Sequence, residues 1–207
     1  EFDYIIVGAG SAGSALAARL SEDQNLRVLV LEAGPWGKHP WLHIPICYGK
    51  VFYDRRFNWK YNTEPQTNLN NRSIYWPRGK VLGGSSAINA MVYVRGHPGD
   101  FAEWEDVAPG WGWDDVEPMF RRMENWQGAP DQKRGRSGPL GVTDVTSMVH
   151  PLSRAYLEAA EQAGIATNHD YNSGNMDGAA LFQITTKNGL RASAAQAYLK
   201  PATHGLH

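Results

Sequence analysis

The feature that most constrains this chain is the glycine pattern Gly8-x-Gly10-x-x-Gly13, close to its start. An apolar run at residues 4–7 precedes the pattern and indicates a buried strand, and a run of strong helix formers, residues 14–20, follows it. Between a strand and a helix, the first glycine allows a tight turn, the second lets the backbone approach a pyrophosphate, and the third lets helix and strand pack closely. The first amides of the helix then face the phosphates. The pattern therefore predicts a dinucleotide site on a βαβ unit.

Glu32 lies at the position where a dinucleotide site on a βαβ unit commonly has an acidic residue. Residues 27–31 form the second apolar run of the βαβ unit, and Glu32 follows at its carboxyl end. A carboxylate at that place accepts hydrogen bonds from the ribose hydroxyls of an adenosine, and it repels the 2′-phosphate of NADP. An ordinary surface glycine turn beside an exposed glutamate is the alternative interpretation. The order strand, helix, strand and acid favours dinucleotide binding.

Composition narrows the class of protein further. A chain of 207 residues can bury a substantial core, and a net charge of −1 gives no sign of a nucleic-acid partner or an anionic membrane surface. Cys47 is the one cysteine, which excludes an internal disulfide and fits a reducing compartment. No transmembrane segment and no signal peptide are predicted. We therefore expect a cytoplasmic protein, with peripheral membrane association left open.

A long stretch after the βαβ unit, residues 36–72, shows the period of neither a helix nor a strand. It is rich in aromatic residues: Trp36, Trp41, Tyr48, Phe52, Tyr53, Phe57, Trp59 and Tyr61. An irregular segment of this length inside a compact domain is commonly functional, so we interpret it as an extended arm that lies along a bound cofactor. A surface excursion anchored by packed aromatic rings is the alternative.

A second glycine-rich loop lies within residues 77–96. Two adjacent glycines and two serines, residues 83–86, predict a flexible turn followed by a helix N-cap. Such a turn directs several amides the same way, which suits phosphate oxygens or an electron-rich ring edge, and Arg78 and Lys80 add positive charge beside it. The physical interpretation is a second anion-binding loop. A plain glycine turn before a capped helix is the alternative.

Three stretches together resemble the glucose–methanol–choline (GMC) oxidoreductases, flavoproteins that use FAD. They are residues 3–13 with 32–34, residues 77–96, which are similar to the family's first signature almost throughout, and residues 188–201. The resemblance covers essentially the whole chain and is nearest to choline-dehydrogenase-like and alcohol-dehydrogenase-like members. It implies an α/β fold, in which a Rossmann-type FAD-binding domain is joined by part of a second, α+β substrate-binding domain.

The resemblance also implies the residues of a cofactor site. Ser11 and Ala12 correspond to contacts with the FAD pyrophosphate, Glu32 to the adenosine ribose, and Trp59 to an aromatic that covers the cofactor. The other expected cofactor-binding residues, several of them through their backbone, are Gly8, Gly10, Gly13, Ala33, Val81, Gly84, Ser85, Asn89, Ala90, Met91 and Val92. Members that tether the flavin covalently carry a His immediately before the Asn of this loop. Ile88 occupies that position here, so we expect FAD to be held non-covalently.

The remaining elements are interpreted mainly as packing. We expect helices near 100–106, 113–125 and 152–163 and after residue 192, strands at 140–145 and 179–186, and a loop with the character of a linker at 127–138. The helix at 113–125 carries a buried stripe at helical spacing: Val116, Met119, Phe120 and Met123. The expected domains are an FAD-binding domain at residues 1–137, a partial substrate-binding domain at 138–188, and a return to the FAD-binding domain at 189–207.

No catalytic base and no metal site are nominated. The family's base is a His, paired with a second His or an Asn, close to the C-terminus of relatives more than twice this length. It is therefore expected C-terminal to residue 207, and the chain is expected to be the N-terminal part of a larger protein. The histidines present are expected to be solvated, capping or tail residues: His39, His43, His97, His150, His169, His204 and His207.

The chemistry implied for the whole protein is FAD-dependent oxidation of an alcohol, in which a base removes the hydroxyl proton while a hydride passes to flavin N5. The implied partners are a small-molecule alcohol and an electron acceptor. Two alternatives are kept. One is a non-redox flavoprotein of the same family, of the hydroxynitrile lyase or fatty-acid photodecarboxylase type, and the other is a non-catalytic nucleotide-binding fragment.

Overall fold

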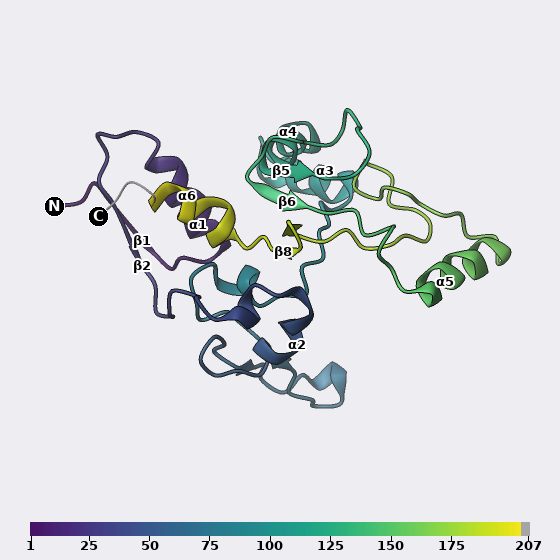
Figure 1. The fold of residues 1–207 in the computed structure, drawn as a ribbon, viewed down its shortest axis with the longest axis horizontal. Helices are drawn as coiled ribbons and strands as arrows, with labels where there is room; N and C mark the ends of the chain where they lie inside the picture. The colour runs from purple at the N-terminus through teal and green to yellow at the C-terminus, as the bar shows by residue number, and fades with distance from the viewer. Residues whose placement is uncertain (204–207) are drawn as a thin grey trace. The chain divides into compact units, whose positions relative to one another are not determined.

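The computed structural model describes residues 1–203, and its first elements are those that the glycine pattern predicts (Figure 1). Strand β1 (Tyr4–Val7) leads into helix α1 (Ser11–Leu20), and the chain returns through strand β2 (Val28–Leu31). The two strands pair in parallel, with Tyr4 opposite Val28 and Val7 opposite Leu31. A parallel pair needs a crossover, which α1 supplies. The predicted βαβ unit is therefore confirmed.

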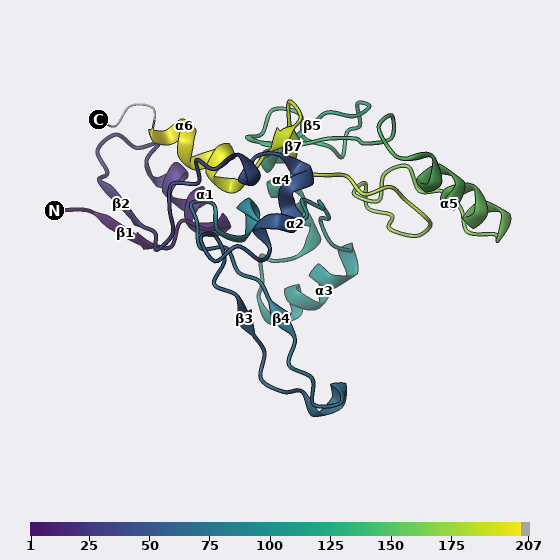
Figure 2. The same cartoon turned by 60° about the horizontal axis from the view of Figure 1, so that its bottom comes forward.

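Small side chains bring this helix close to the sheet. Ala9 and Ala17 are buried together with Ile6 and with Leu199, which comes from the far end of the chain. Leu199 belongs to a π-helical segment, η5 (Ala195–Leu199), which continues into α6 (Lys200–Thr203). Figures 1 and 2 both draw this yellow segment alongside α1. The expected helix after residue 192 thus completes the core of the βαβ unit.

Strand β1 is less buried than its apolar sequence suggests. Only Ile6 is buried, whereas Ile5 is 60% exposed and Val7 is 84% exposed. Within residues 1–203 the sheet consists of β1 and β2 alone, and a parallel strand is buried on both faces only where something packs on each face. The prediction of a fully buried strand was therefore wrong for the described part of the chain.

The aromatic-rich stretch contains short elements around a second core. Turns η1 (Pro40–Leu42) and η2 (Pro45–Cys47) and the short helix α2 (Tyr48–Val51) precede a hairpin of β3 (Tyr61–Asn62) and β4 (Tyr75–Trp76), with η3 (Thr67–Leu69) near its tip. Figure 2 shows the hairpin extending from this core. The core residues are Leu42, Val51, Phe57, Val81, Ala87 and Ile88. The stretch is therefore partly a packed core and partly an extended arm.

The second glycine loop forms a short turn. Element η4 (Gly84–Ala87) is a 3-10 turn that begins after Gly83 without a side-chain cap, so the two serines do not form the helix N-cap that was expected. Further along, β7 (Thr186–Lys187) and β8 (Leu190–Arg191) form a small hairpin. The strand expected at 179–186 was wrong for most of its length. The Gln183 carbonyl accepts from the Tyr93 amide, while Ile184 pairs with Thr143, so the hydrogen-bonding partner changes from one residue to the next and no continuous ladder forms.

The remaining helices lie between residues 92 and 185. They are α3 (Pro98–Val107), α4 (Trp113–Met123) and α5 (Pro151–Gln162). In the same segment, strands β5 (Glu124–Trp126) and β6 (Leu140–Val142) pair in parallel. They lie beside a core of Tyr93, Trp126 and Val142. The predicted helices are confirmed. The expected buried stripe on α4 is only partly buried, since Val116, Phe120 and Met123 are half-buried and Met119 is 56% exposed. No helix between residues 1 and 203 is both long and apolar enough to cross a membrane.

The chain divides into two compact units, one made of residues 1–91 with the chain from residue 186 onward, and one made of residues 92–185. The segment 127–138, expected to be a linker, lies inside the second unit. Its Arg134 is buried and donates to Glu124 at 2.8 Å and to Asp170 at 2.8 Å. Buried ion pairs tie this segment into the core of its unit, so it does not separate domains. The division by packing therefore differs from the expected boundary at residue 137, and the cofactor and substrate roles of the segments stay a prediction.

Candidate cofactor site

The first glycine loop has the geometry that a close-packed strand-to-helix turn requires. Gly8 has a φ of +95°, in the region that favours glycine, and its amide donates to the Leu31 carbonyl oxygen at 2.7 Å. A Cβ on Gly13 would lie 2.0 Å from the Gly8 carbonyl oxygen, so only glycine fits there. A Cβ on Gly10 would meet no atom within 4 Å. The turn is therefore tight at its base and open above Gly10.

The Glu32 carboxylate is fixed by backbone amides from both sides. Its Oε2 accepts from the Ala9 amide at 2.8 Å, and its Oε1 accepts from the Gly34 amide at 2.9 Å. The first bond ties the end of β2 to the glycine turn, and the second closes the turn after the strand. A carboxylate held at two points is preorganised, and each oxygen keeps a lone pair for a ligand hydroxyl.

The second glycine loop meets the first backbone to backbone. A Cβ on Gly84 would lie 2.7 Å from the Gly10 Cα atom, and the Gly83 amide donates to the Ala9 carbonyl oxygen at 2.8 Å. Gly79 packs in turn against Gly84, since a Cβ on Gly79 would lie 2.2 Å from the Gly84 carbonyl carbon. Two loops that are far apart in the sequence therefore converge above the N-terminus of α1.

A groove of about 920 Å³ lies where these loops meet. It is lined by several of the expected cofactor-binding residues: Gly8, Gly10, Ser11, Glu32, Ala33, Trp59, Gly84 and Ser85. The groove combines the amides at the start of a helix, one carboxylate and an exposed indole. That set suits a ligand with phosphates, ribose hydroxyls and a flat ring system.

Other groove residues were not in the expected set. Tyr61, Arg78 and Gly79 also line the groove. The Tyr61 ring stacks on the Trp59 ring with centroids 5.9 Å apart and planes 5° apart, and the Lys80 Nζ atom lies 4.4 Å from the Trp59 ring centroid. Lys60, between the two rings, has a φ of +58°, so the alternation of side chains along an extended strand does not account for this pair. The stacking of Tyr61 on Trp59 is set by the tertiary structure.

The remaining expected residues do not line this groove: Ala12, Gly13, Val81, Asn89, Ala90, Met91 and Val92. Ala12 and Gly13 lie in the first turn of α1. Val81 is fully buried in the core with Ile88, so its side chain faces away from solvent. Val92 begins the second unit. Their part in a cofactor site stays a prediction.

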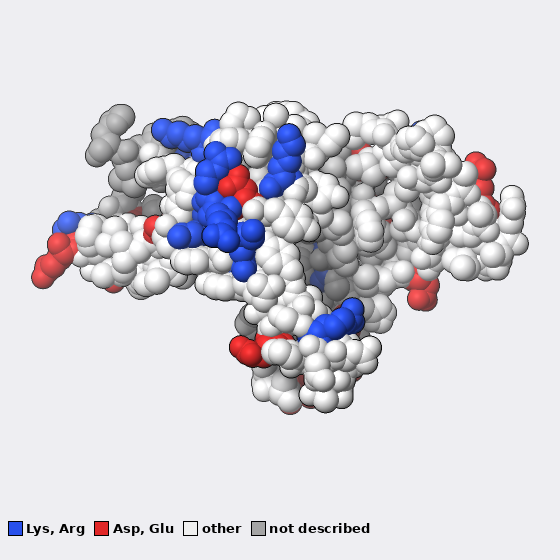
Figure 3. Space-filling model, turned by 90° about the horizontal axis from the view of Figure 1, so that it is seen from below, with Lys and Arg blue, Asp and Glu red and all other residues white. Residues whose placement is uncertain are grey.

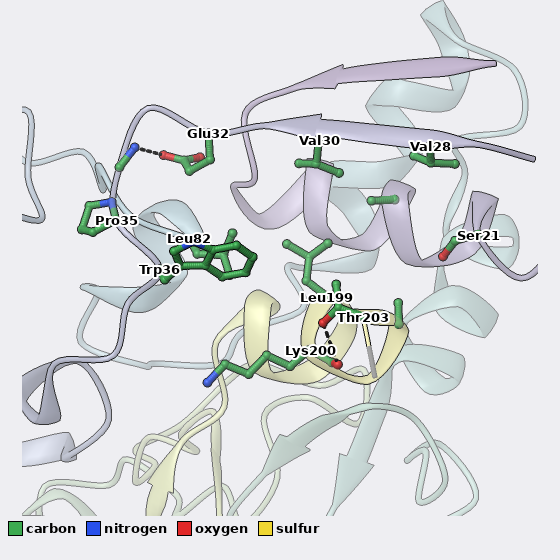
Figure 4. A pocket seen from close by; sticks show the side chains of 13 residues that line it. Ser21, Val28, Val30, Glu32, Pro35, Trp36, Leu82, Leu199, Lys200 and Thr203 are labelled. Carbon is green, nitrogen blue, oxygen red and sulfur yellow. Dashed lines mark hydrogen bonds between the residues drawn. The ribbon is translucent and has the colours of Figure 1, made fainter. Parts of the chain in front are cut away.

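A separate apolar pocket of about 340 Å³ adjoins Glu32 (Figure 4). Val28 and Val30 of β2 face Leu199 and Thr203 across it, and the Trp36 indole stands at one side. Glu32 lines both this pocket and the groove. The carboxylate thus separates a polar space, where the glycine loops meet, from an apolar one.

Positive charge accompanies the second glycine loop. The Arg78 guanidinium carbon lies 5.0 Å from the Trp76 ring centroid, and its Nη1 donates to the Pro77 carbonyl oxygen at 2.8 Å. On the face that Figure 3 draws, Lys and Arg side chains gather in one patch around acidic side chains. Arg78 lines the groove, and its charge, with the helix dipole of α1, favours an anionic ligand there.

The histidines are placed as packing and capping residues. Side chains of His39, His97 and His150 each accept a backbone amide at the start of a helical element, which confirms the capping expectation. His43 contacts the Gly37 carbonyl oxygen at 2.8 Å, and burial lowers its pKa. His169 is exposed, and His204 and His207 lie outside the described residues. Among residues 1–203, no histidine lines the groove, and no cluster of side chains is suited to a metal ion.

Comparisons with known proteins show what the whole chain is similar to. The sequence profile of the GMC oxidoreductase family matches residues 2–205. The chain is 51% identical to the oxygen-dependent choline dehydrogenase of Rhizobium etli (strain CIAT 652) over 98% of its length, and 44% identical to the alcohol dehydrogenase [acceptor] of Pseudomonas putida over 96%. It spans 37% and 36% of the length of those two proteins.

Solved structures show the same fold. Pyridoxine 4-oxidase from Mesorbium loti superposes with a TM-score of 0.93 at 40% identity, covering 99% of this chain and 40% of that one. An Aspergillus oryzae formate oxidase variant, studied for FAD modification, superposes with a TM-score of 0.85 at 29% identity, covering 97% of this chain and 37% of that one. These matches confirm the α/β fold class and the resemblance expected from the sequence, and they support FAD as the cofactor.

Proposed function

Because this chain belongs to the GMC oxidoreductase family, we propose that it forms the FAD-binding part of an enzyme that oxidises an alcohol. The observation that carries the proposal is the convergence of the two glycine loops, with Gly84 packed on Gly10 beside the fixed Glu32 carboxylate. A groove of about 920 Å³ opens at that point. FAD, when bound, supplies a two-electron acceptor for the substrate hydride.

The residues of the groove have distinct roles in this proposal. The amides of Ser11 and Ala12 at the start of α1 bind the pyrophosphate, since they lie at the positive end of the helix. Glu32 accepts the ribose hydroxyls through the lone pairs that its two backbone contacts leave open. The stacked rings of Trp59 and Tyr61 supply an apolar wall that keeps water from one side of the groove.

We further propose that FAD is held without a covalent bond. Ile88, in the position of the tethering His of some relatives, is buried in the core with Val81 and Phe57. An aliphatic side chain has no nucleophilic atom with which to bond the flavin. Acid precipitation of the FAD-loaded protein should leave the yellow colour in the supernatant, and colour retained in the pellet would contradict a non-covalent site.

The substrate class follows from the relatives that the chain resembles. Their names specify choline, alcohols and pyridoxine, all of which carry an alcohol group. We propose a small-molecule alcohol as the substrate of the whole protein. Anaerobic mixing of the FAD-loaded whole protein with choline, pyridoxine and a series of primary alcohols should bleach the flavin absorbance band with at least one of them.

Gly10 offers a sharp test of the groove itself. Gly10→Ala adds a methyl group that meets no protein atom within 4 Å and needs no change of φ, so the protein should fold normally. The methyl group would project where the backbone must approach the pyrophosphate, so FAD should bind at least about tenfold more weakly. The dissociation constant of FAD, followed by flavin fluorescence, measures the effect.

Gly49→Ala is the matched control for this substitution. A Cβ on Gly49 also meets nothing within 4 Å, and Gly49 does not line the groove. This control should leave FAD affinity unchanged, and it should raise thermal stability slightly if at all, because Gly49 lies in helix α2, where alanine is the better helix former. Equal FAD affinity in Gly10→Ala and Gly49→Ala would contradict the placement of FAD over the first glycine loop.

A further inference from the structure

Arg191 is a buried cation with donors that no described residue accepts. Arg191 is only 3% exposed. The Nη1 atom donates to the Ser86 carbonyl oxygen at 3.2 Å and to Asn89 Oδ1 at 2.8 Å. The Nε and Nη2 atoms are buried and have no hydrogen-bond partner among residues 1–203. Burying donors without acceptors costs folding free energy, so a native protein keeps them for a reason.

The contrast with the other buried arginines makes Arg191 stand out. Arg95 and Arg134 both pair with the Glu124 carboxylate, at 2.5 Å and 2.8 Å. Within the described part of the chain, Arg191 forms no ion pair. Burial lowers its pKa to about 10, which still leaves the guanidinium charged at neutral pH. A buried charge without a counterion is a place where an anion is favoured.

The partners of Arg191 belong to the second glycine loop. Asn89 Oδ1, which accepts from Arg191, also accepts the Met91 amide at 3.1 Å. Met91 has a φ of +65°, a strained value for a residue with a side chain. The Ser86 hydroxyl provides a second anchor, since it accepts the Ala194 amide at 2.9 Å and donates to the Gly83 carbonyl oxygen at 2.6 Å. The segment 191–194 therefore holds the loop at two points.

We propose that Arg191 is a positioning residue of the cofactor site, which fixes the loop of residues 84–91 and supplies positive charge for an anionic group bound against it. The inference rests on the proposed function. With FAD as the ligand, the anionic group is either a phosphate or the two-electron-reduced flavin ring. A phosphate would make the charge act on FAD affinity, and the reduced ring would make it act on the midpoint potential.

The size of the expected effect follows from Coulomb's law. A unit charge about 10 Å from another, at an effective permittivity of about 20, changes an equilibrium constant by roughly tenfold. Arg191→Gln keeps a polar side chain of similar reach but removes the charge. Arg191→Lys keeps the charge but loses the planar fork that reaches both Ser86 and Asn89.

The experiment uses the FAD-loaded protein and measures two quantities, the dissociation constant of FAD and the midpoint potential of bound FAD. Arg191→Gln should weaken FAD binding by about tenfold if the anion is a phosphate, or lower the midpoint potential if it is the reduced ring. In Arg191→Lys, whichever of the two quantities Arg191→Gln changes, FAD affinity or midpoint potential, should remain near its wild-type value. Ser86→Ala, which removes the other anchor without changing any charge, should have the smaller effect on that quantity.

The outcomes separate this inference from the proposed function. Wild-type protein that fails to bind FAD contradicts the proposed function. Wild-type protein that binds FAD, with Arg191→Gln within twofold in affinity and unchanged in potential, overturns the role of Arg191. Circular dichroism checks the fold of each variant. Should Arg191→Gln not fold, Arg191→Lys decides, because retained FAD affinity and midpoint potential support a role for the charge, and the loss of either overturns it.

Discussion

At the scale of single residues, the candidate site depends on side chains that backbone hydrogen bonds hold in one orientation. Glu32 is the clearest case, because both of its oxygens already accept a backbone amide. These bonds hold the carboxylate at the end of β2 and give it an orientation before any ligand arrives. The same residue therefore contributes to the fold and to the expected ribose contact.

Glu32→Gln should separate these two roles better than Glu32→Ala. The amide oxygen of Gln can still accept one backbone amide, so the loss of stability should be about 1 kcal/mol. The lost charge-assisted bonds to the ribose should weaken FAD binding by about ten- to a hundredfold. Urea unfolding and FAD titration measure the two effects. Glu22→Gln, at an exposed ion pair with Arg19, is the control, and a dissociation constant equal to that control would remove Glu32 from the site.

At the scale of elements, a segment without regular structure is held in the core by buried ion pairs. The loop of residues 127–138 has the composition of a linker, yet Arg134 joins it to Glu124 of β5 and to Asp170. The Arg134 guanidinium also lies 3.9 Å from the Trp126 ring centroid. Glu124 is fully buried, and its carboxylate is paired with the guanidinium groups of Arg134 and Arg95.

Removing Arg134 should therefore destabilise the unit of residues 92–185. Arg134→Ala leaves buried carboxylate charge poorly compensated, and we expect a loss of about 3–5 kcal/mol in the free energy of unfolding. Arg136→Ala, two residues away at an exposed position, should change it by less than about 0.5 kcal/mol. Urea unfolding followed by tryptophan fluorescence measures both. A loss below about 1 kcal/mol for Arg134→Ala would mean that the network contributes little.

At the scale of the whole molecule, the described lining of the groove includes no histidine. Its ionisable side chains are Glu32, Tyr61 and Arg78. Glu32 is committed to two backbone amides, the Tyr61 ring is stacked on Trp59, and the Arg78 guanidinium presents only hydrogen-bond donors. The relatives are far longer than this chain, which spans 37% of the Rhizobium etli choline dehydrogenase.

We therefore expect the 207-residue chain by itself to show no oxidation of alcohols, even when loaded with FAD. Hydride transfer needs a base within hydrogen-bond reach of the substrate hydroxyl and a pocket that positions the carbon. Stopped-flow absorbance with choline and primary alcohols, after circular dichroism has shown that the chain is folded, is the measurement. Bleaching of the flavin band above a buffer control would show that one of the described side chains acts as the base.

The sequence alone was sufficient for the features that depend on neighbouring residues. The glycine pattern predicted β1, α1, β2 and the acidic residue after β2, because a tight turn and close helix packing restrict the residues that can occupy each position. The histidine caps and the helices at 98–107, 113–123 and 151–162 also follow from local spacing and capping chemistry. Non-covalent binding of FAD, expected from Ile88 before Asn89 through the family resemblance, stays a prediction.

Only the tertiary structure could decide which distant segments meet. The contact of Gly84 with Gly10 and the burial of Arg191 beneath Asn89 join residues far apart in the chain, and no local period signals such pairs. The failed strand at 179–186 and the exposed face of β1 have the same origin. A strand exists, and is buried, only where other segments pair with its edges and pack on its faces, and those partners are set by the fold as a whole.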